Sequence, residues 1–248
     1  MNRLIIISGA TSGLGKEIAL IHAKRGDFLI LISRDKEKLL HIKESQSKKN
    51  NISIVVKDLS KKQSFSWFKK KVGSFISSKE ISEVTIYNNA SSINPIQEIH
   101  NQSFNDVYQN INLNLSAPFL LSSIILKIKN EIGIKASIIN ISSGVSKKPI
   151  LGWSLYCTTK AGVNMLTSCV NEENEDVYTL AINPGAMDTP MQAEIRNSDK
   201  SVSPISDQFR KMKKENLLQS PKKVAKKLID IVESKEFVSG YFVDFNKI

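Results

Sequence analysis

The feature that most constrains this chain is a regular alternation of short branched-aliphatic runs with longer amphipathic stretches. We expect strands at 3–7, 28–33, 52–56, 84–88, 136–141, 177–182 and 240–244. We expect helices near 14–25, 35–46, 61–78, 103–130, 154–172 and 221–233. Apolar strands separated by helices are typical of a parallel sheet that is covered on both faces. The sequence therefore predicts an α/β fold, with a doubly wound parallel sheet in a three-layer αβα sandwich.

The length and the connecting segments indicate one domain over residues 1–248. No repeat, low-complexity tract or Pro/Gly-rich linker marks a boundary. The stretch at about 186–216 is polar, lacks a clear period and carries Pro190 and Pro204. A long irregular segment inside a compact domain is more often a lid or binding loop than a linker, so we expect a substrate lid here.

The composition indicates which classes of binding partner and which cellular compartment to expect. The net charge of +11 comes mainly from lysines spread along the chain, and no recognition motif accompanies them, so we expect no nucleic-acid partner. Uninterrupted apolar runs such as 119–126 are short, so we expect no membrane span. Cys157 and Cys169 suit a reducing compartment, and no export signal is readable, which favours the cytoplasm. The three histidines have no metal-ligand spacing, so no metal site is expected.

A glycine-rich segment, SGATSGLGK from Ser8 to Lys16, follows the first expected strand. Such a segment allows a tight strand-to-helix turn and a close approach of backbone to phosphate groups. The helix N-terminus behind it would supply amide donors to a pyrophosphate. The alternative interpretation of this GxxxGxG spacing is an ordinary flexible turn. The candidate cofactor residues are Gly9, Ser12, Gly13, Leu14 and Gly15.

The end of the second expected strand bears on the choice between NAD and NADP. A carboxylate at this tip would bind the ribose hydroxyls of NAD, whereas a nearby arginine accommodates the 2′-phosphate of NADP. Ser33 occupies the tip and Arg34 follows it, which favours NADPH/NADP+ as the cofactor. Asp35 is better placed as the N-cap of the next helix.

Asp58 and Leu59 end the third expected strand, and we regard both as candidate cofactor residues. The carboxylate of Asp58 has two interpretations that stay open. It could accept a hydrogen bond from the adenine amino group, or it could cap the following helix.

Tyr156 and Lys160 stand four residues apart, so a helix places both side chains on one face. A tyrosine hydroxyl has an ordinary pKa of about 10 and is a poor acid near neutrality. A neighbouring ammonium favours the phenolate and makes the proton easier to give up. Ser143, at the end of an expected strand, can hydrogen-bond a substrate oxygen. With Asn114 upstream, this set predicts reduction of a carbonyl group.

Together these segments resemble the classical short-chain dehydrogenase/reductase family over nearly the whole chain. The resemblance implies a Rossmann fold with a catalytic tetrad of Asn114, Ser143, Tyr156 and Lys160. It implies that Tyr156 is the acid and that Lys160 binds the nicotinamide ribose and lowers the pKa of the tyrosine. It also implies that Asn114 holds a water molecule of a proton relay.

The resemblance implies further cofactor contacts around the nucleotide. Asn88, Asn89 and Ala90, which end the fourth expected strand, match the segment that supports the sheet and lines the nucleotide. The turn from Asn183 through Pro184 and Gly185, together with Thr189, matches the part that closes over nicotinamide.

Within the family, the segments Gly152-Trp153, 156–165 and 188–196 are similar to the benzil reductases that form (S)-benzoin, which are relatives of sepiapterin reductase. Three departures from the family pattern stand out. Ser8 replaces a usual threonine, Ser91 replaces a usual glycine, and the segment 171–176 is short at a place that bears on the dimer contact.

We therefore expect an NADPH-dependent carbonyl reductase that acts on a small molecule. The resemblance implies reduction of one carbonyl of a vicinal diketone such as benzil to (S)-benzoin, by a homodimer or homotetramer. Other short-chain reductases, for pterins or 3-oxoacyl thioesters, and a non-catalytic NADP-binding sensor are the alternatives. An apolar rim is expected from Ile150, Leu151, Trp153, Met187 and Met191.

Overall fold

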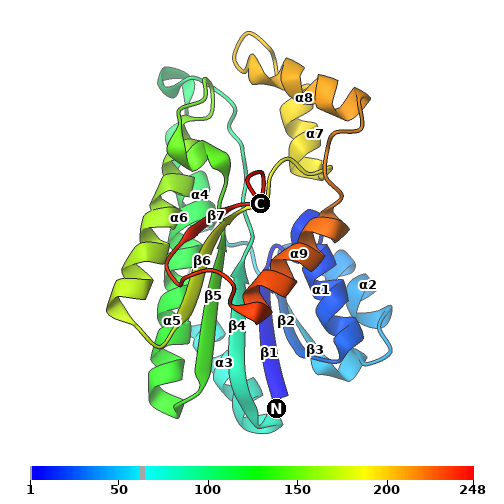
Figure 1. Cartoon of the computed structure of the whole chain (residues 1–248), viewed down its shortest axis with the longest axis vertical. Coiled ribbons are helices and arrows are strands. Elements are labelled where there is room, and N and C mark those ends of the chain that lie inside the picture. Colours follow the sequence, from blue (N-terminus) through cyan, green and yellow to red (C-terminus); the bar gives the residue numbers. More distant parts are fainter. Residues whose placement is uncertain (1, 62–64) are drawn as a thin grey trace.

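The computed structural model describes residues 2–61 and 65–248. Within these ranges, seven strands form one sheet in the order β3-β2-β1-β4-β5-β6-β7, and every neighbouring pair is parallel. The expected doubly wound α/β sheet is therefore confirmed (Figure 1). The strands are β1 (Asn2–Ser8), β2 (Phe28–Ser33), β3 (Ile52–Val56), β4 (Ile81–Asn88), β5 (Lys135–Ile141), β6 (Tyr178–Asn183) and β7 (Phe242–Asp244).

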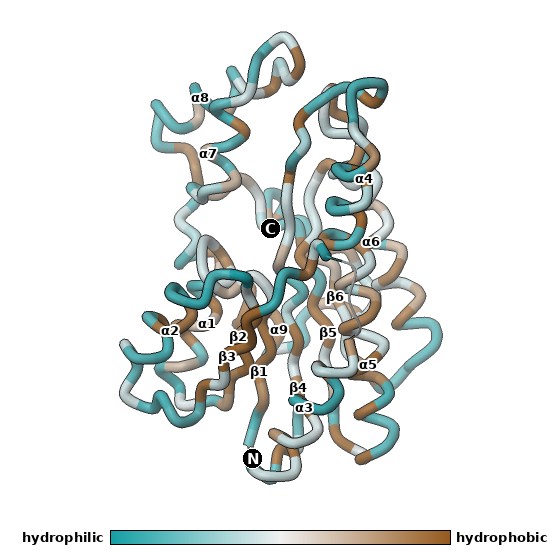
Figure 2. The backbone as a smooth tube through the Cα atoms, turned by 180° about the vertical axis from the view of Figure 1, so that it is seen from behind, coloured by the Kyte–Doolittle hydropathy of each residue, from teal (hydrophilic) through white to brown (hydrophobic). Residues whose placement is uncertain are grey.

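Helices cover both faces of the sheet because successive strand side chains point to opposite sides. In β1, Ile5 and Ile7 pack in one core with the helices at 13–25, 36–44 and 221–234, whereas Leu4 and Ile6 pack in a second core with the helices at 66–79, 117–132 and 154–173. Figure 2 shows the strands as a hydrophobic centre between these layers. The helices are α1 (Gly13–Arg25), α2 (Lys36–Glu44), α3 (Ser66–Lys79), α4 (Phe104–Ile111), α5 (Ala117–Ile132), α6 (Ser154–Glu173), α7 (Pro190–Asn197), α8 (Ile205–Lys214) and α9 (Pro221–Ser234).

The helix expected at 61–78 is described from Ser66 onward, and positions 62–64 lie outside the described residues. The helix expected at 103–130 is interrupted by a π-helical turn, Asn112–Ser116, between α4 and α5. The whole stretch Phe104–Ile132 is apolar and long enough to cross a membrane by composition alone, which the uninterrupted runs did not indicate. In the structure, its buried side packs on the sheet through Leu121, Ile125 and Ile128.

The segment expected to be an irregular lid is more regular than the sequence analysis indicated. It contains α7 and α8, which lie above the carboxyl ends of the strands (Figure 1). Two backbone hydrogen bonds join the base of this segment, from the Asp188 amide to the Gln219 carbonyl and from the Gln219 amide to the Ala186 carbonyl. We call residues 186–219 the lid segment.

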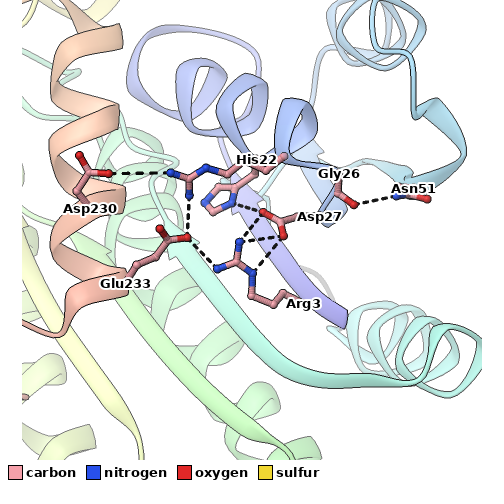
Figure 3. Close-up of polar contacts among 8 residues, drawn as sticks. Arg3, His22, Gly26, Asp27, Asn51, Asp230 and Glu233 are labelled. Atoms are coloured by element: carbon pink, nitrogen blue, oxygen red, sulfur yellow. Dashed lines mark hydrogen bonds and ion pairs between the residues drawn. The ribbon is translucent and has the colours of Figure 1, made fainter. Parts of the chain in front are cut away.

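A network of charges fastens the opposite, amino end of the sheet (Figure 3). Arg3 of β1 binds Asp27 at 3.0 Å and Glu233 of α9 at 2.8 Å. The buried ring of His22 in α1 contacts the same Asp27 carboxylate at 2.7 Å. These contacts tie two helices to the first strand at the end of the sheet remote from the glycine-rich segment.

Candidate active site

The strand order reverses between β1 and β4, and ligands of open α/β sheets bind where such a reversal opens a crevice. A cavity of about 910 Å³ lies at the carboxyl ends of these strands. It is lined by the glycine-rich segment, the tip of β2, the ends of β4 and β5, the start of α6 and the lid segment. Every expected cofactor residue lines this cavity except Gly15 and the buried Asn88, whose side chain donates to Ser122 and Asn140.

The glycine-rich segment forms a cradle that other residues would fill. Gly9 has a φ of +68° and Gly13 a φ of +50°, a region in which only glycine is at ease. A Cβ atom on Gly9 would stand 2.8 Å from the Cα of Ala90, and one on Gly15 would stand 2.4 Å from the Gly9 carbonyl oxygen. Gly15 therefore acts by close packing under the turn, and α1 begins at Gly13 without a side-chain hydrogen bond from its N-cap Ser12, which leaves its first amides open to an anion.

The ends of β1 and β4 are joined by side chains that shape this cradle. The Asn89 amide nitrogen donates to the carbonyl oxygens of Ser8 and Gly9, both at 3.0 Å. The Ser8 hydroxyl accepts from the backbone amides of Asn89 and Ala90 at 3.0 and 3.1 Å. Serine at position 8 thus supplies the hydroxyl that this junction needs.

The tip of β2 carries the groups that would meet the adenosine end of a dinucleotide. Arg34 lines the cavity, with Lys38 and Lys57 also in the lining. Asp35 caps α2 as expected, accepting from the Lys38 amide at 3.0 Å, and its carboxylate also pairs with the Lys38 ammonium at 2.8 Å. Three positive groups, Arg34, Lys38 and Lys57, line this part of the cavity with two carboxylates, Asp35 and Asp58.

Asp58 does not cap α3, because α3 begins at Ser66. Its carboxylate accepts from the Ser60 amide at 3.0 Å and from the Ser60 hydroxyl at 2.7 Å, and it lines the cavity next to Leu59. Of the two interpretations of Asp58, the helix cap is therefore wrong.

Ser143, Tyr156 and Lys160 all line the cavity. Ser143 follows the end of β5 by two residues, and the other two lie on one face of α6, where the tyrosine is 8% and the lysine 3% exposed. Burial raises the pKa of Tyr156 to about 12, and side-chain hydrogen bonds with Ser143 and Ser91 act in the opposite direction.

Lys160 is held against the strand rather than against the phenol. Its ammonium nitrogen donates to the Ile141 carbonyl at 2.7 Å and lies 5.5 Å from the centre of the Tyr156 ring. Burial lowers the pKa of Lys160 to about 7, because the charged form loses its hydration. The resemblance implied that Lys160 lowers the pKa of Tyr156. In this structure, burial instead has the largest effect on the pKa of both side chains.

Asn114 lies in the π-helical turn and does not line the cavity. Its amide accepts from the Ser92 backbone at 2.9 Å and donates to the Ser92 carbonyl at 2.8 Å. Because π-helical turns are frequent at functional sites, this position agrees with a role beside the reacting groups. Asn114 therefore contacts the loop after β4 at Ser91 and Ser92, two residues that line the cavity together with Tyr156.

The cavity beyond Tyr156 has an apolar wall, although the lid segment also places the polar residues Gln192, Glu194 and Gln208 in the lining. Trp153 is nearly fully buried there, with its ring stacked on Phe209 of α8 and its edge toward Tyr156. Leu151, expected in the rim, is 52% exposed and points away from the cavity, so that expectation is wrong. The apolar lining consists of Val145, Ile150, Trp153, Met187, Met191, Ile195, Ile205 and Phe209.

The turn after β6 and the start of α7 close the cavity from the lid side. Gly185 has a φ of +77°, and a Cβ atom there would stand 2.6 Å from the Gln219 side chain. Thr189 caps α7, and its methyl carbon lies 3.0 Å from where a Cβ atom of Gly13 would be. Pro184, Gly185 and Thr189 therefore face the glycine cradle across the cavity.

Comparison with known proteins agrees with this geometry. Residues 3–200 match the family model of short chain dehydrogenases. The chain belongs to the short-chain dehydrogenase family. It is 37% identical over 242 residues to benzil reductase ((S)-benzoin forming) of Bacillus cereus, covering 96% of this chain and 97% of the relative. It is 28% identical to sepiapterin reductase of Xenopus tropicalis, covering 98% and 95%.

Solved structures share the fold of this dehydrogenase. ElxO with NADP bound has a TM-score of 0.77 and 23% identity, covering 98% of this chain and 97% of that one. The 4-hydroxyisoleucine dehydrogenase complexed with NADH has a TM-score of 0.73 and 20% identity, covering 98% and 96%.

Several residues of this dehydrogenase's cavity were not anticipated from the sequence. Ile195, Ile205 and Phe209 belong to α7 and α8, which the sequence analysis did not predict. A signal was present, since Thr189 followed by Pro190 is a helix start, and Ile205, Phe209 and Met212 have helical spacing. Thr11, inside the glycine-rich segment, and Lys38 also line the cavity, although neither was among the expected cofactor residues.

Proposed function

We propose that this short-chain dehydrogenase is an NADPH-dependent carbonyl reductase that reduces one carbonyl of a vicinal diketone such as benzil to (S)-benzoin. The observation that carries the proposal is the contrast within one cavity. Ser143 and Tyr156 form a polar corner for a single oxygen, and the wall beside them is made of aromatic and aliphatic side chains. Such a wall suits a flat apolar body. The name of the Bacillus cereus relative supports the same substrate class.

The proposed reaction needs little from the protein beyond holding and protonating the substrate oxygen. NADPH, when held by the cavity residues, would supply the hydride that the carbonyl carbon needs. Ser143 donates a hydrogen bond to the carbonyl oxygen and holds it beside the phenol of Tyr156. Tyr156 gives its proton to this oxygen, so that an alcohol forms and a phenolate remains. Lys160, whose pKa of about 7 lies near neutrality, is suited to exchange protons close to the phenolate.

The cofactor contacts proposed for this chain follow the cavity from end to end. The cradle of Gly9 and Gly13 with the start of α1 suits the pyrophosphate, and Pro184, Gly185 and Thr189 face the nicotinamide side. Arg34 and Lys38 at the β2 tip favour a 2′-phosphate, which is the basis for proposing NADPH over NADH. Asp58 and Leu59 line the adenine end.

We also propose that the enzyme is a cytoplasmic homodimer or homotetramer. Large apolar side chains on the neighbouring helices α4, α5 and α6 are exposed, among them Phe104 at 80%, Phe119 at 56% and Met165 at 65%. A self-complementary association through these helices would cover them, and it would account for the apolar outer side of the stretch Phe104–Ile132. Light scattering of the purified protein measures the state directly; a monomer at micromolar concentration contradicts this part.

The function is tested by an NADPH-oxidation screen of aromatic and aliphatic vicinal diketones, pterins and 3-oxoacyl thioesters. We expect the diketones to give the highest kcat/KM, with aromatic ones preferred. A pterin or a thioester as the best substrate would replace the substrate assignment and keep the reductase. NADPH binding without turnover of any carbonyl compound would instead indicate a non-catalytic sensor.

A further inference from the structure

Ser91, in the loop after β4, lies between the cavity and the side chain of Asn114. Its side chain lines the catalytic cavity, at the place where the family pattern has a glycine and thus no side chain. The Ser91 hydroxyl lies 3.2 Å from the side-chain oxygen of Asn114. A glycine at this position could not make this contact with Asn114.

The direction of this hydrogen bond is fixed by the backbone around it. The Asn114 side chain accepts from the Ser92 amide and donates to the Ser92 carbonyl, so its oxygen and nitrogen cannot be exchanged. The Asn114 oxygen can only accept, and the Ser91 hydroxyl must therefore donate to it. The Ser91 oxygen can then still accept a hydrogen bond.

The phenol of Tyr156 lines the same cavity as Ser91 and Ser143, and side-chain hydrogen bonding by these two residues acts to lower its pKa against the effect of burial. We propose that Ser91 is a further catalytic residue, whose hydroxyl joins Asn114 to Tyr156 and turns to donate to the phenolate oxygen once the tyrosine has given up its proton. The proposal rests on the carbonyl reduction proposed above. No proton leaves Ser91 in this step, because only the direction of its hydrogen bond changes.

The turn of the hydroxyl leaves no buried group without a partner. When Ser91 donates to Tyr156, the Asn114 oxygen keeps its 2.9 Å hydrogen bond from the Ser92 amide. A hydrogen bond to a charged oxygen is stronger than one to a neutral amide oxygen, so ionisation of the phenol favours the turned hydroxyl. Ser91 thereby makes the phenolate easier to form in a site whose burial opposes it.

The ionisable groups that face Tyr156 must be separated in any test of this role. Lys160 comes from the same helix and Cys157 is its neighbour in sequence, whereas Ser143 from β5, Ser91 from the β4 loop and Met191 from α7 are the uncharged groups around the phenol. Lys160 titrates near pH 7, so it produces a pH dependence of its own. If a limb of the pH profile of kcat reports the ionisation of Tyr156, it should move when Ser91 is substituted. A limb that reports the ionisation of Lys160 should stay in place.

The kinetic test uses oxidation of benzoin by NADP+, which requires the phenolate. We expect Ser91→Gly and Ser91→Ala to move the rising limb of kcat against pH upward by about one unit and to lower kcat below the limb about tenfold. Ser91→Thr, which keeps the hydroxyl, should restore the wild-type limb. The affinity for NADPH, read by fluorescence titration, should stay within about twofold. Ser77→Ala, on the exposed side of α3, is the matched control. A lower kcat with an unmoved limb would overturn the proposal.

A second measurement needs no substrate and so separates this proposal from the substrate assignment. Carbon-13 labelling of the tyrosine ring carbon that bears the hydroxyl gives five resonances, and Tyr156→Phe identifies the one that matters. Ser91→Gly should shift the Tyr156 resonance, and Ser77→Ala should leave it in place. An unchanged Tyr156 resonance in Ser91→Gly would overturn the contact, whatever carbonyl compound the enzyme reduces. A shifted resonance without any diketone turnover would keep the contact and refute only the substrate.

Discussion

The ammonium nitrogen of Lys160 donates a 2.7 Å hydrogen bond to the backbone carbonyl of Ile141, at the end of β5. This bond anchors the lysine in a buried position, where desolvation lowers its pKa to about 7 from an ordinary value of 10.5. The folded protein therefore binds this proton less tightly than the unfolded chain does.

A pH dependence of stability follows from Lys160. Between pH 7 and pH 10.5, unfolding takes up a proton, so the free energy of unfolding contributed by this site rises with pH by about 1.4 kcal/mol per unit. Lys160→Met removes this dependence, and the wild type should gain stability relative to the variant across that window. Denaturant unfolding at pH 7, 8 and 9 measures it, with Lys222→Met on the exposed side of α9 as control. Parallel curves for wild type and Lys160→Met would contradict the buried position of the charge.

Arg34 should govern the choice of cofactor. Arg34→Ala removes a charge-assisted contact with the 2′-phosphate, worth about 1–3 kcal/mol, so the KM for NADPH should rise roughly tenfold or more. The KM for NADH, which lacks that phosphate, should change little. Steady-state kinetics with both cofactors decides the matter. Equal kcat/KM of the wild-type enzyme with NADPH and NADH would refute the assignment.

Trp153 should couple the lid segment to the substrate wall. Its indole nitrogen donates to the buried Ser203 hydroxyl at 2.9 Å, and its ring stacks on Phe209. Ser203→Ala leaves the buried indole N–H without an acceptor, and Phe209→Leu removes the stack. Each change should lower kcat/KM for benzil about fivefold and leave that for 2,3-butanedione, which is too small to reach this wall, nearly unaltered. Equal losses for both diketones would show a general effect on folding instead.

Asp27 should stabilise the amino end of the sheet. Burial alone raises the pKa of this carboxyl group, but hydrogen bonds and charge from His22 and Arg3 outweigh it and lower the pKa below 3.8. The stabilisation is therefore present above pH 3.8 and is lost as the pH falls through the lowered value. Asp27→Asn should cost about 3 kcal/mol at pH 7, and this cost should diminish as the pH falls below 3.8. Asp230→Asn, at the exposed 4.0 Å pair with Arg25, should cost little.

Most of the fold follows from local pattern, because buried parallel strands must be apolar along their length. The runs around Ile5, Leu31 and Ile139 mark the centre of the sheet for this reason. The lid helices were missed because α7 and α8 are short and polar, with one narrow apolar edge formed by residues such as Ile195 and Phe209.

The candidate set of Ser143, Tyr156 and Lys160 could be proposed from the sequence because its members have fixed spacing on one helix and after one strand. The π-helical turn at Asn114 was not readable, since it depends on hydrogen bonds to Ser92, far away in sequence. The balance of pKa values was not readable either. Spacing places Lys160 beside Tyr156, but only the fold shows that burial raises the pKa of one and lowers that of the other.

The most direct measurement is chiral chromatography of the product that the enzyme forms from benzil and NADPH. We predict (S)-benzoin in large excess, because a chiral cavity with Ser143 and Tyr156 at one corner admits hydride to one face of the carbonyl. Tyr156→Phe, which still has the cofactor cradle, should bind NADPH normally and form product at least about 100-fold more slowly. Racemic benzoin, or near-normal turnover by Tyr156→Phe, would contradict the account.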